Sequence, residues 1–262
     1  SRFRKTGFFI SVIFTKIFQQ MKLDILAFGV HPDDVELSCA GTLLAAANEG
    51  KATGIVDLTQ GELGTRGTAE TRKIEAENAA KVLKIKVREN LEMADGFFQN
   101  DEAHQRKIIE VIRKYQPEII LCNAVHDRHP DHGRSAKLVS DAAFLSGLRK
   151  IVTNHDGKLQ EAWRPKYVFH YIQDRYMQPN FLVDISTVYD AKMEAIQCYT
   201  TQFFNPDLQE PQTYISNPMF LETVKAKDMM LGKIIGVNYA EGFITEKIIG
   251  IQSFDALIQN VT

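Results

Sequence analysis

The sequence predicts an α/β fold, a three-layer sandwich in which helices cover both faces of a mostly parallel, Rossmann-like sheet. An apolar run at 25–28 precedes a helical pattern of small residues at 38–48, and a second apolar run follows at 53–58. This strand, helix, strand order favours parallel strands joined by a right-handed crossover. The succession of strand, polar turn and helix recurs at 119–123 and 135–148.

Length and composition indicate one domain. The chain has 262 residues, of which 44% are hydrophobic, enough for one full core, so we expect a single domain over 21–262. Its net charge of -2, with acids and bases interspersed, argues against a nucleic-acid partner. Three distant cysteines, Cys39, Cys122 and Cys198, argue against disulfides and favour a reducing compartment, hence a cytoplasmic location.

The first twenty residues differ from the rest of the chain. They begin with basic residues and carry a short apolar stretch at 8–14, too short to span a bilayer. We predict a leader or upstream extension at 1–20 that is not part of the fold, with no stable membrane insertion. An anchor on a membrane surface is the alternative.

The turn after the first predicted strand carries His31, Asp33 and Asp34 around Pro32. His31 and Asp34 are three residues apart at the start of a helix, so both can face one cation, while Asp33 is directed elsewhere and is free to act as a base. The alternative is that Asp33 and Asp34 only cap the helix, whose N-terminus favours negative charge.

A second polar turn follows the predicted strand at 119–123 and contains His126, His129 and His132, so four of the seven histidines lie at two strand ends. In a parallel sheet, two such turns can share one crevice. Nitrogen ligands favour zinc over a hard cation. Cys39 could be a further ligand or a buried hydrophobic residue.

Two other segments suggest ligand contacts. Three glycines at 61–67 allow the backbone to approach a ligand closely, and a flexible surface loop is the alternative. The polar, proline-bearing segment 205–218, with Tyr214, suits a lid or an oligomer contact. No Gly-x-Gly-x-x-Gly follows the first strand, which weakens a dinucleotide-binding interpretation.

The two turns carry a resemblance. The signatures at 31–36 and 129–132 resemble those of the LmbE-like, or PIG-L, family of zinc-dependent N-acetylglucosaminyl deacetylases, and the likeness extends from Met21 to the C-terminus. Residues 61–67, Arg72 and 127–128 look most like the bacillithiol-pathway branch, which deacetylates N-acetylglucosaminyl-malate. The resemblance implies the LmbE-like fold, hydrolysis of the acetamide of a small-molecule sugar conjugate to acetate and a free amine, and a homo-oligomer, trimer or hexamer.

It also implies roles for individual residues. The metal ligands would be His31, Asp34 and His132, with His126 as a rival for the third place. They would hold Zn²⁺, although Fe²⁺ accepts the same ligands. Asp33 would be the base, ionised at pH 7 because an aspartate ordinarily titrates near 4. His129 would stabilise the oxyanion or protonate the leaving amine, and Asp131 would fix its tautomer and raise its pKa.

Substrate contacts follow from the same likeness. Arg72, Glu62, Gly64 and Asp95 would contact the sugar, and Tyr214 would close over it. Arg128 could pair with a carboxylate such as malate. Competing hypotheses are a deacetylase of another amide-bearing conjugate, a Rossmann-like nucleotide-sugar protein that binds Mg²⁺, and a non-catalytic metal- or sugar-binding protein.

Overall fold

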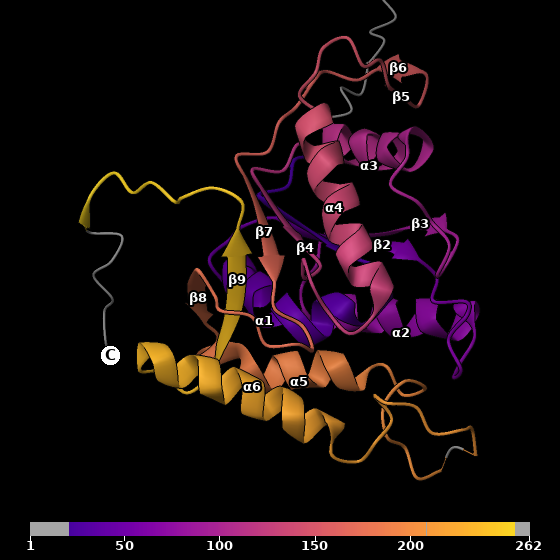
Figure 1. The fold of residues 1–262 in the computed structure, drawn as a ribbon, viewed down its shortest axis with the longest axis vertical. Helices are drawn as coiled ribbons and strands as arrows, with labels where there is room; N and C mark the ends of the chain where they lie inside the picture. Colours follow the sequence, from indigo (N-terminus) through magenta and orange to yellow (C-terminus); the bar gives the residue numbers. More distant parts are fainter. Residues whose placement is uncertain (1–20, 208, 255–262) are drawn as a thin grey trace, which may run out of the picture.

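The computed structural model describes residues 21–207 and 209–254, arranged as a sheet with helices on both faces (Figure 1). The described sheet has seven strands in the order β3-β2-β1-β4-β7-β9-β8. Their bounds are β1 Ile25–Gly29, β2 Thr53–Thr59, β3 Val87–Met93, β4 Ile119–Cys122, β7 Tyr167–Tyr171, β8 Phe181–Asp184 and β9 Ala240–Thr245. The first five strands in this order, β3, β2, β1, β4 and β7, are parallel to one another. Strand β9 runs antiparallel to its neighbours β7 and β8. The predicted α/β class is confirmed, and the predicted leader lies outside the described residues.

Helices α1, α2, α5 and α6 pack on one face of the sheet and α3 and α4 on the other. Their bounds are α1 Asp34–Asn48, α2 Ala69–Val82, α3 Glu102–Tyr115, α4 Pro130–Leu145, α5 Tyr189–Gln197 and α6 Phe220–Ile235. A 3₁₀ turn, η1 (Ser186–Val188), precedes α5, and the strands β5 (Asn154–His155) and β6 (Lys158–Leu159) form a separate hairpin. None of these helices is both long enough and apolar enough to cross a membrane.

Helices α1 and α4 begin earlier than the apolar pattern predicts. In α4, Pro130 occupies the first helical turn, where a missing N–H costs nothing, and His129 is the N-cap. In α1 the first helical residue is Asp34. Asp34 therefore opens α1, and Asp131 and His132 lie in the first turn of α4, whereas His31, Asp33 and His129 precede the two helices.

Helix α6 is not predicted by the sequence pattern, and it covers part of the sheet beside β9 and β8. Its residues Phe220, Val224 and Leu231 are buried at helical spacing. It ends at Gly236, whose φ of 79° is the left-handed conformation common after a helix.

The strand order reverses between β1 and β4. The chain leaves β1 toward β2 on one side of the sheet, whereas β4 pairs with β1 on the other side. Ligand sites in open α/β sheets form at such a reversal, outside the carboxyl ends of the strands. The turns after β1 and β4 meet there.

Candidate metal centre

The turn after β1 is built around the Asp34 carboxylate. Its Oδ2 accepts hydrogen bonds from the backbone N–H groups of Val30 and His31, each at 3.0 Å, and from Asn123 Nδ2 at 3.0 Å. Asp33, the N-cap residue of α1, has a φ of 126° and makes no side-chain cap. Strained backbone of this kind is concentrated at functional sites. The alternative that Asp33 only caps α1 is wrong, because its side chain makes no capping hydrogen bond.

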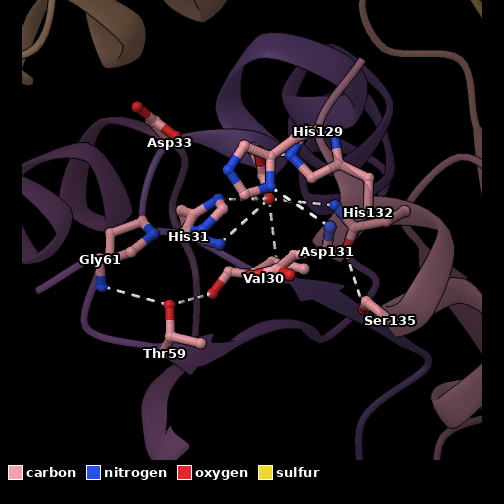
Figure 2. Close-up of polar contacts among 12 residues, drawn as sticks. Val30, His31, Asp33, Thr59, Gly61, His129, Asp131, His132 and Ser135 are labelled. Carbon is pink, nitrogen blue, oxygen red and sulfur yellow. Dashed lines mark hydrogen bonds and ion pairs between the residues drawn. The ribbon is translucent and has the colours of Figure 1, made fainter. Parts of the chain in front are cut away.

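The turn after β4 brings two imidazoles to the same point (Figure 2). The ring centroids of His31 and His129 are 4.9 Å apart, and those of His129 and His132 are 5.3 Å apart. One nitrogen from each of these three rings lies within 4.8 Å of the others. Asp34 joins them, because its Oδ1 is 3.2 Å from His132 Nε2 and its Oδ2 is 3.7 Å from His31 Nδ1.

A carboxylate orients each of the two predicted histidine ligands. His31 Nε2 is 2.9 Å from Asp95 Oδ1, and His132 Nδ1 is 2.5 Å from Asp127 Oδ2. These contacts leave His31 Nδ1 and His132 Nε2 directed at Asp34. A histidine that binds a metal usually makes such a contact through its other ring nitrogen.

The carboxylate of Asp34 and the imidazole of His132 shift each other's pKa. Although burial opposes ionisation, the neighbouring His132 and His31 hold the pKa of Asp34 well below its usual range. Burial likewise opposes the charged form of His132, but Asp34 and Asp127 raise its pKa to about 10. A cation bound between these groups would take the place of the histidine proton.

The residues present suit a divalent transition metal. Two neutral imidazole nitrogens and one carboxylate oxygen are the donor set of many catalytic zinc sites, which keep an open position. Gln173 Nε2 donates to Asp34 Oδ1 at 3.2 Å, so the ligating carboxylate is itself held in place. The sequence pattern does not predict the orienting roles of Asp127, Asn123 and Gln173. Of these, only Asp127 adjoins a recognisable motif.

Asp33 lies apart from the three imidazoles in Figure 2. Its Oδ2 is 3.3 Å from Arg72 Nη2, and the same nitrogen donates to the Pro32 carbonyl at 2.7 Å. Burial raises the pKa of Asp33 to about 7, although Arg72 opposes the increase. The expectation of an ordinary value near 4 is therefore wrong, and the value found lies where a general base is most effective at neutral pH.

His129 and Asp131 do not interact as predicted. The Asp131 carboxylate accepts hydrogen bonds from Gly96 N at 2.8 Å and Arg134 Nη1 at 2.6 Å, while its backbone N–H donates to His129 Nδ1 at 3.3 Å. Burial and the imidazoles of His31 and His132 lower the pKa of His129. The charge of Asp131 acts in the predicted direction and raises this pKa, but its effect is smaller than the other three, so the net change is downward.

The centre opens into a cleft of about 630 Å³ that also includes Gly64, Arg72, Asp95, Arg128 and Tyr214. Asp95 contacts His31, which points to an orienting role different from the predicted sugar contact. The Tyr214 hydroxyl donates to Asp174 at 2.9 Å, and the Arg128 guanidinium stacks on the Tyr214 ring at 4.3 Å.

Three predicted or rival residues are placed outside the centre. Both carboxylate oxygens of Glu62 accept backbone N–H groups, those of Asp95 and Gln60, and Glu62 does not line the described cleft. His126 is exposed and contacts Arg175, so it is not the third ligand. Cys39 is buried in the apolar core, where burial raises the pKa of its thiol.

This sheet, with a histidine and aspartate cluster at its strand reversal, defines an α/β protein with a candidate metal site. The family model, described as GlcNAc-PI de-N-acetylase, matches residues 26–143, which include both turns. The chain belongs to the PIG-L, or LmbE-like, family of deacetylases.

Relatives of known structure or activity extend the match beyond these residues. A conserved protein from Thermus thermophilus superposes with a TM-score of 0.78 at 34% identity, over 88% of this chain and 98% of that one. The diacetylchitobiose deacetylase of Thermococcus kodakarensis is 27% identical over 83% of this chain and 81% of its own length. The 4-oxalmesaconate hydratase of Pseudomonas putida is 26% identical over 68% of this chain and 73% of its own.

Proposed function

We propose that this chain hydrolyses the acetamide of an N-acetylglucosamine conjugate and releases acetate and a free amine. The observation that carries the proposal is the pairing of a His31, Asp34 and His132 donor set with a separate buried carboxylate, Asp33. A relative named as a deacetylase of an N-acetylated sugar supports it.

We assign His31, Asp34 and His132 to hold the metal, Zn²⁺ in the first instance and Fe²⁺ as the alternative. The bound cation supplies Lewis acidity, which can lower the pKa of water to about 7. Asp95 and Asp127 keep the two imidazoles in the tautomers that leave His31 Nδ1 and His132 Nε2 free to ligate.

Asp33 accepts the proton of the attacking water. Its pKa of about 7 lets it take that proton and then pass it to the leaving nitrogen. Arg72 holds the carboxylate in place and moderates the effect of burial on its pKa. The predicted contact of Arg72 with sugar hydroxyls stays a prediction.

His129 stabilises the charge that develops on the acetamide oxygen. Its Nδ1 accepts the Asp131 N–H, so the ring proton of the neutral imidazole lies on Nε2. The Nε2–H group is then the donor toward the oxyanion.

We take N-acetylglucosaminyl L-malate of the bacillithiol pathway as the most specific substrate to test. Gly64 at the cleft would approach the sugar, Tyr214 would cover it, and Arg128 would pair with a malate carboxylate. A cytoplasmic location and a homo-oligomer, trimer or hexamer, are parts of this proposal.

The test is a substrate panel with zinc-loaded protein. It compares N-acetylglucosaminyl-malate, diacetylchitobiose and free N-acetylglucosamine by amine release, and 4-oxalmesaconate by loss of its conjugated double bond. We expect amine release, fastest from the malate conjugate. Consumption of 4-oxalmesaconate without any amine release would replace the deacetylase with a hydratase, and fastest release from diacetylchitobiose would replace the malate conjugate alone.

A further inference from the structure

The described α6 wall of the cleft is largely apolar and carries one cation. Phe220, Val224 and Leu231 line it, and Lys227 reaches the same cleft from the middle of the helix. Among the described residues, the hydrogen-bond acceptors of Lys227 Nζ are backbone carbonyls, those of Gln173 at 3.2 Å and of Leu37 and Ile172 at 3.5 Å. These separations are at or beyond the long limit of ordinary hydrogen bonds.

No described carboxylate forms an ion pair with Lys227. The carboxylate of its neighbour Asp228 pairs with Lys192 at 2.6 Å. Burial lowers the pKa of Lys227, and the charges of Asp228, Glu241 and Asp127 oppose the decrease without offsetting it. Such a lysine at a cleft is a candidate binding residue.

One residue, Gln173, contacts both Lys227 and the metal centre. The Gln173 carbonyl accepts from Lys227 Nζ, and the Gln173 side chain donates to Asp34. Ser38 lines the same cleft next to Leu37, and its buried hydroxyl has no hydrogen-bond partner among the described residues. A ligand at the centre can therefore place an acceptor group near the lysine and the serine.

We propose that Lys227 binds an anionic group, a carboxylate or a phosphate, on the part of the substrate beyond the acetylated sugar. This inference rests on the proposed function and names the substrate class of the same site. Arg128 is the weaker anion ligand, because it is exposed and its Nε already lies 3.8 Å from Asp174. Salt and water screen an exposed charge more than one inside a cleft.

The experiment compares Lys227→Met with Lys227→Arg and with Lys225→Met, a control at an exposed lysine of the same helix. The substrates are N-acetylglucosaminyl-malate, N-acetylglucosamine 1-phosphate and the neutral methyl glycoside of N-acetylglucosamine. We expect Lys227→Met to raise KM for one or both anionic substrates by about tenfold or more and to leave the neutral one unchanged. Which anionic substrate is affected identifies the group that is bound. Lys227→Arg should keep the preference, and Lys225→Met should match the wild type.

Calorimetric binding of the same three compounds to chelated protein gives a readout independent of turnover. Charge-selective binding that Lys227→Met abolishes supports the inference even if no amine is released, in which case the proposed deacetylation fails alone. Equal losses on neutral and anionic compounds, or no loss on either, would overturn the inference. Circular dichroism confirms that each variant is folded.

Discussion

At the scale of single residues, Asp33 and Asp34 are adjacent in the chain but differ in electrostatic state. Asp34 is surrounded by donors and imidazoles that keep its pKa below the usual range, whereas burial raises that of Asp33 to about 7. The two carboxylates can therefore divide the work, one as ligand and one as base. Asp33, whose φ is 126°, contacts Arg72, whereas Asp34 contacts the imidazoles.

Asp33→Asn tests this division directly. Because the variant keeps the shape of the side chain but cannot accept a proton, we expect kcat to fall by about 10²- to 10⁴-fold. Zinc content, measured by atomic absorption, should equal that of the wild type. A matching loss of zinc would instead make Asp33 a ligand.

Asp127→Asn tests the orientation of His132. Loss of a carboxylate that orients a ligating histidine weakens metal binding by about 10- to 100-fold, so we expect that change in competition with a chelator. Asp141→Asn is the control. Asp141 lies on α4, the helix that carries His132, and it pairs with the exposed Lys137. Equal zinc affinity in both variants would remove Asp127 from the centre.

The sequence offers candidate ligands and a candidate base but not the residues that hold them in place. The spacing of His31 and Asp34 suggests a shared cation, whereas His132 follows from the family resemblance. Gln173 comes from a turn after β7, and nothing near it in the chain marks it before the fold brings it to Asp34. The pKa of Asp33 was missed for the same reason, because burial is a property of the folded chain.

At the scale of elements, helix α1 is broken at Cys39, whose φ of -146° is not helical. The break is bridged by Glu241 of β9, which accepts hydrogen bonds from the backbone N–H groups of Gly41 at 3.0 Å and Thr42 at 2.7 Å. Glu241 also pairs with the buried Lys192 of α5 at 2.9 Å. This network ties the helix that carries Asp34 to the C-terminal part of the sheet.

Glu241→Ala should therefore destabilise the fold. Removing one member of a buried charge network costs about 3–5 kcal/mol, which a denaturant titration would show as a lower free energy of unfolding. Glu222→Ala on the exposed face of α6 is the control, with a change within about 0.5 kcal/mol. Similar values for both variants would show that the network contributes little.

The loop after β2 allows a test of how Arg72 is positioned beside Asp33. A Cβ at Gly61, whose φ is 66°, would lie 1.9 Å from Arg72 Nη1, so Gly61→Ala must displace the residue that holds Asp33. Misplacing a catalytic group by about 1 Å can lower the rate about 10²-fold, and we expect a loss of that order in kcat/KM. Gly50→Ala is the control, because Gly50 has a φ of 84° but open space around it. It should lose stability and keep activity.

Sequence patterns predicted β1, β2 and β4 well because each is a short apolar run before a polar turn, but not β3, whose residues Val87–Met93 are mostly polar. They missed α6, and they placed the starts of α1 and α4 too late, because polar signature residues occupy the first turns. Those residues are selected for chemistry rather than for an apolar pattern, so the pattern does not mark them as helical.

At the scale of the whole molecule, the metal centre and the opposite wall of the cleft come from different parts of the chain. The family match at 26–143 contains His31, Asp34 and His132, whereas Lys227 and Tyr214 lie beyond it. The first part thus supports the shared chemistry, and the later part is where substrate preference can vary. The single domain predicted over 21–262 stays a prediction.

The most direct test of metal-dependent deacetylation is amine release from N-acetylglucosaminyl-malate as chelated protein is reloaded with zinc in known amounts. We expect no release without metal and a linear increase that ends at about one zinc per chain, because a single centre with three protein ligands holds one ion. Release that is independent of metal, or full loading with one zinc and no release from any N-acetylglucosamine conjugate, would contradict this expectation.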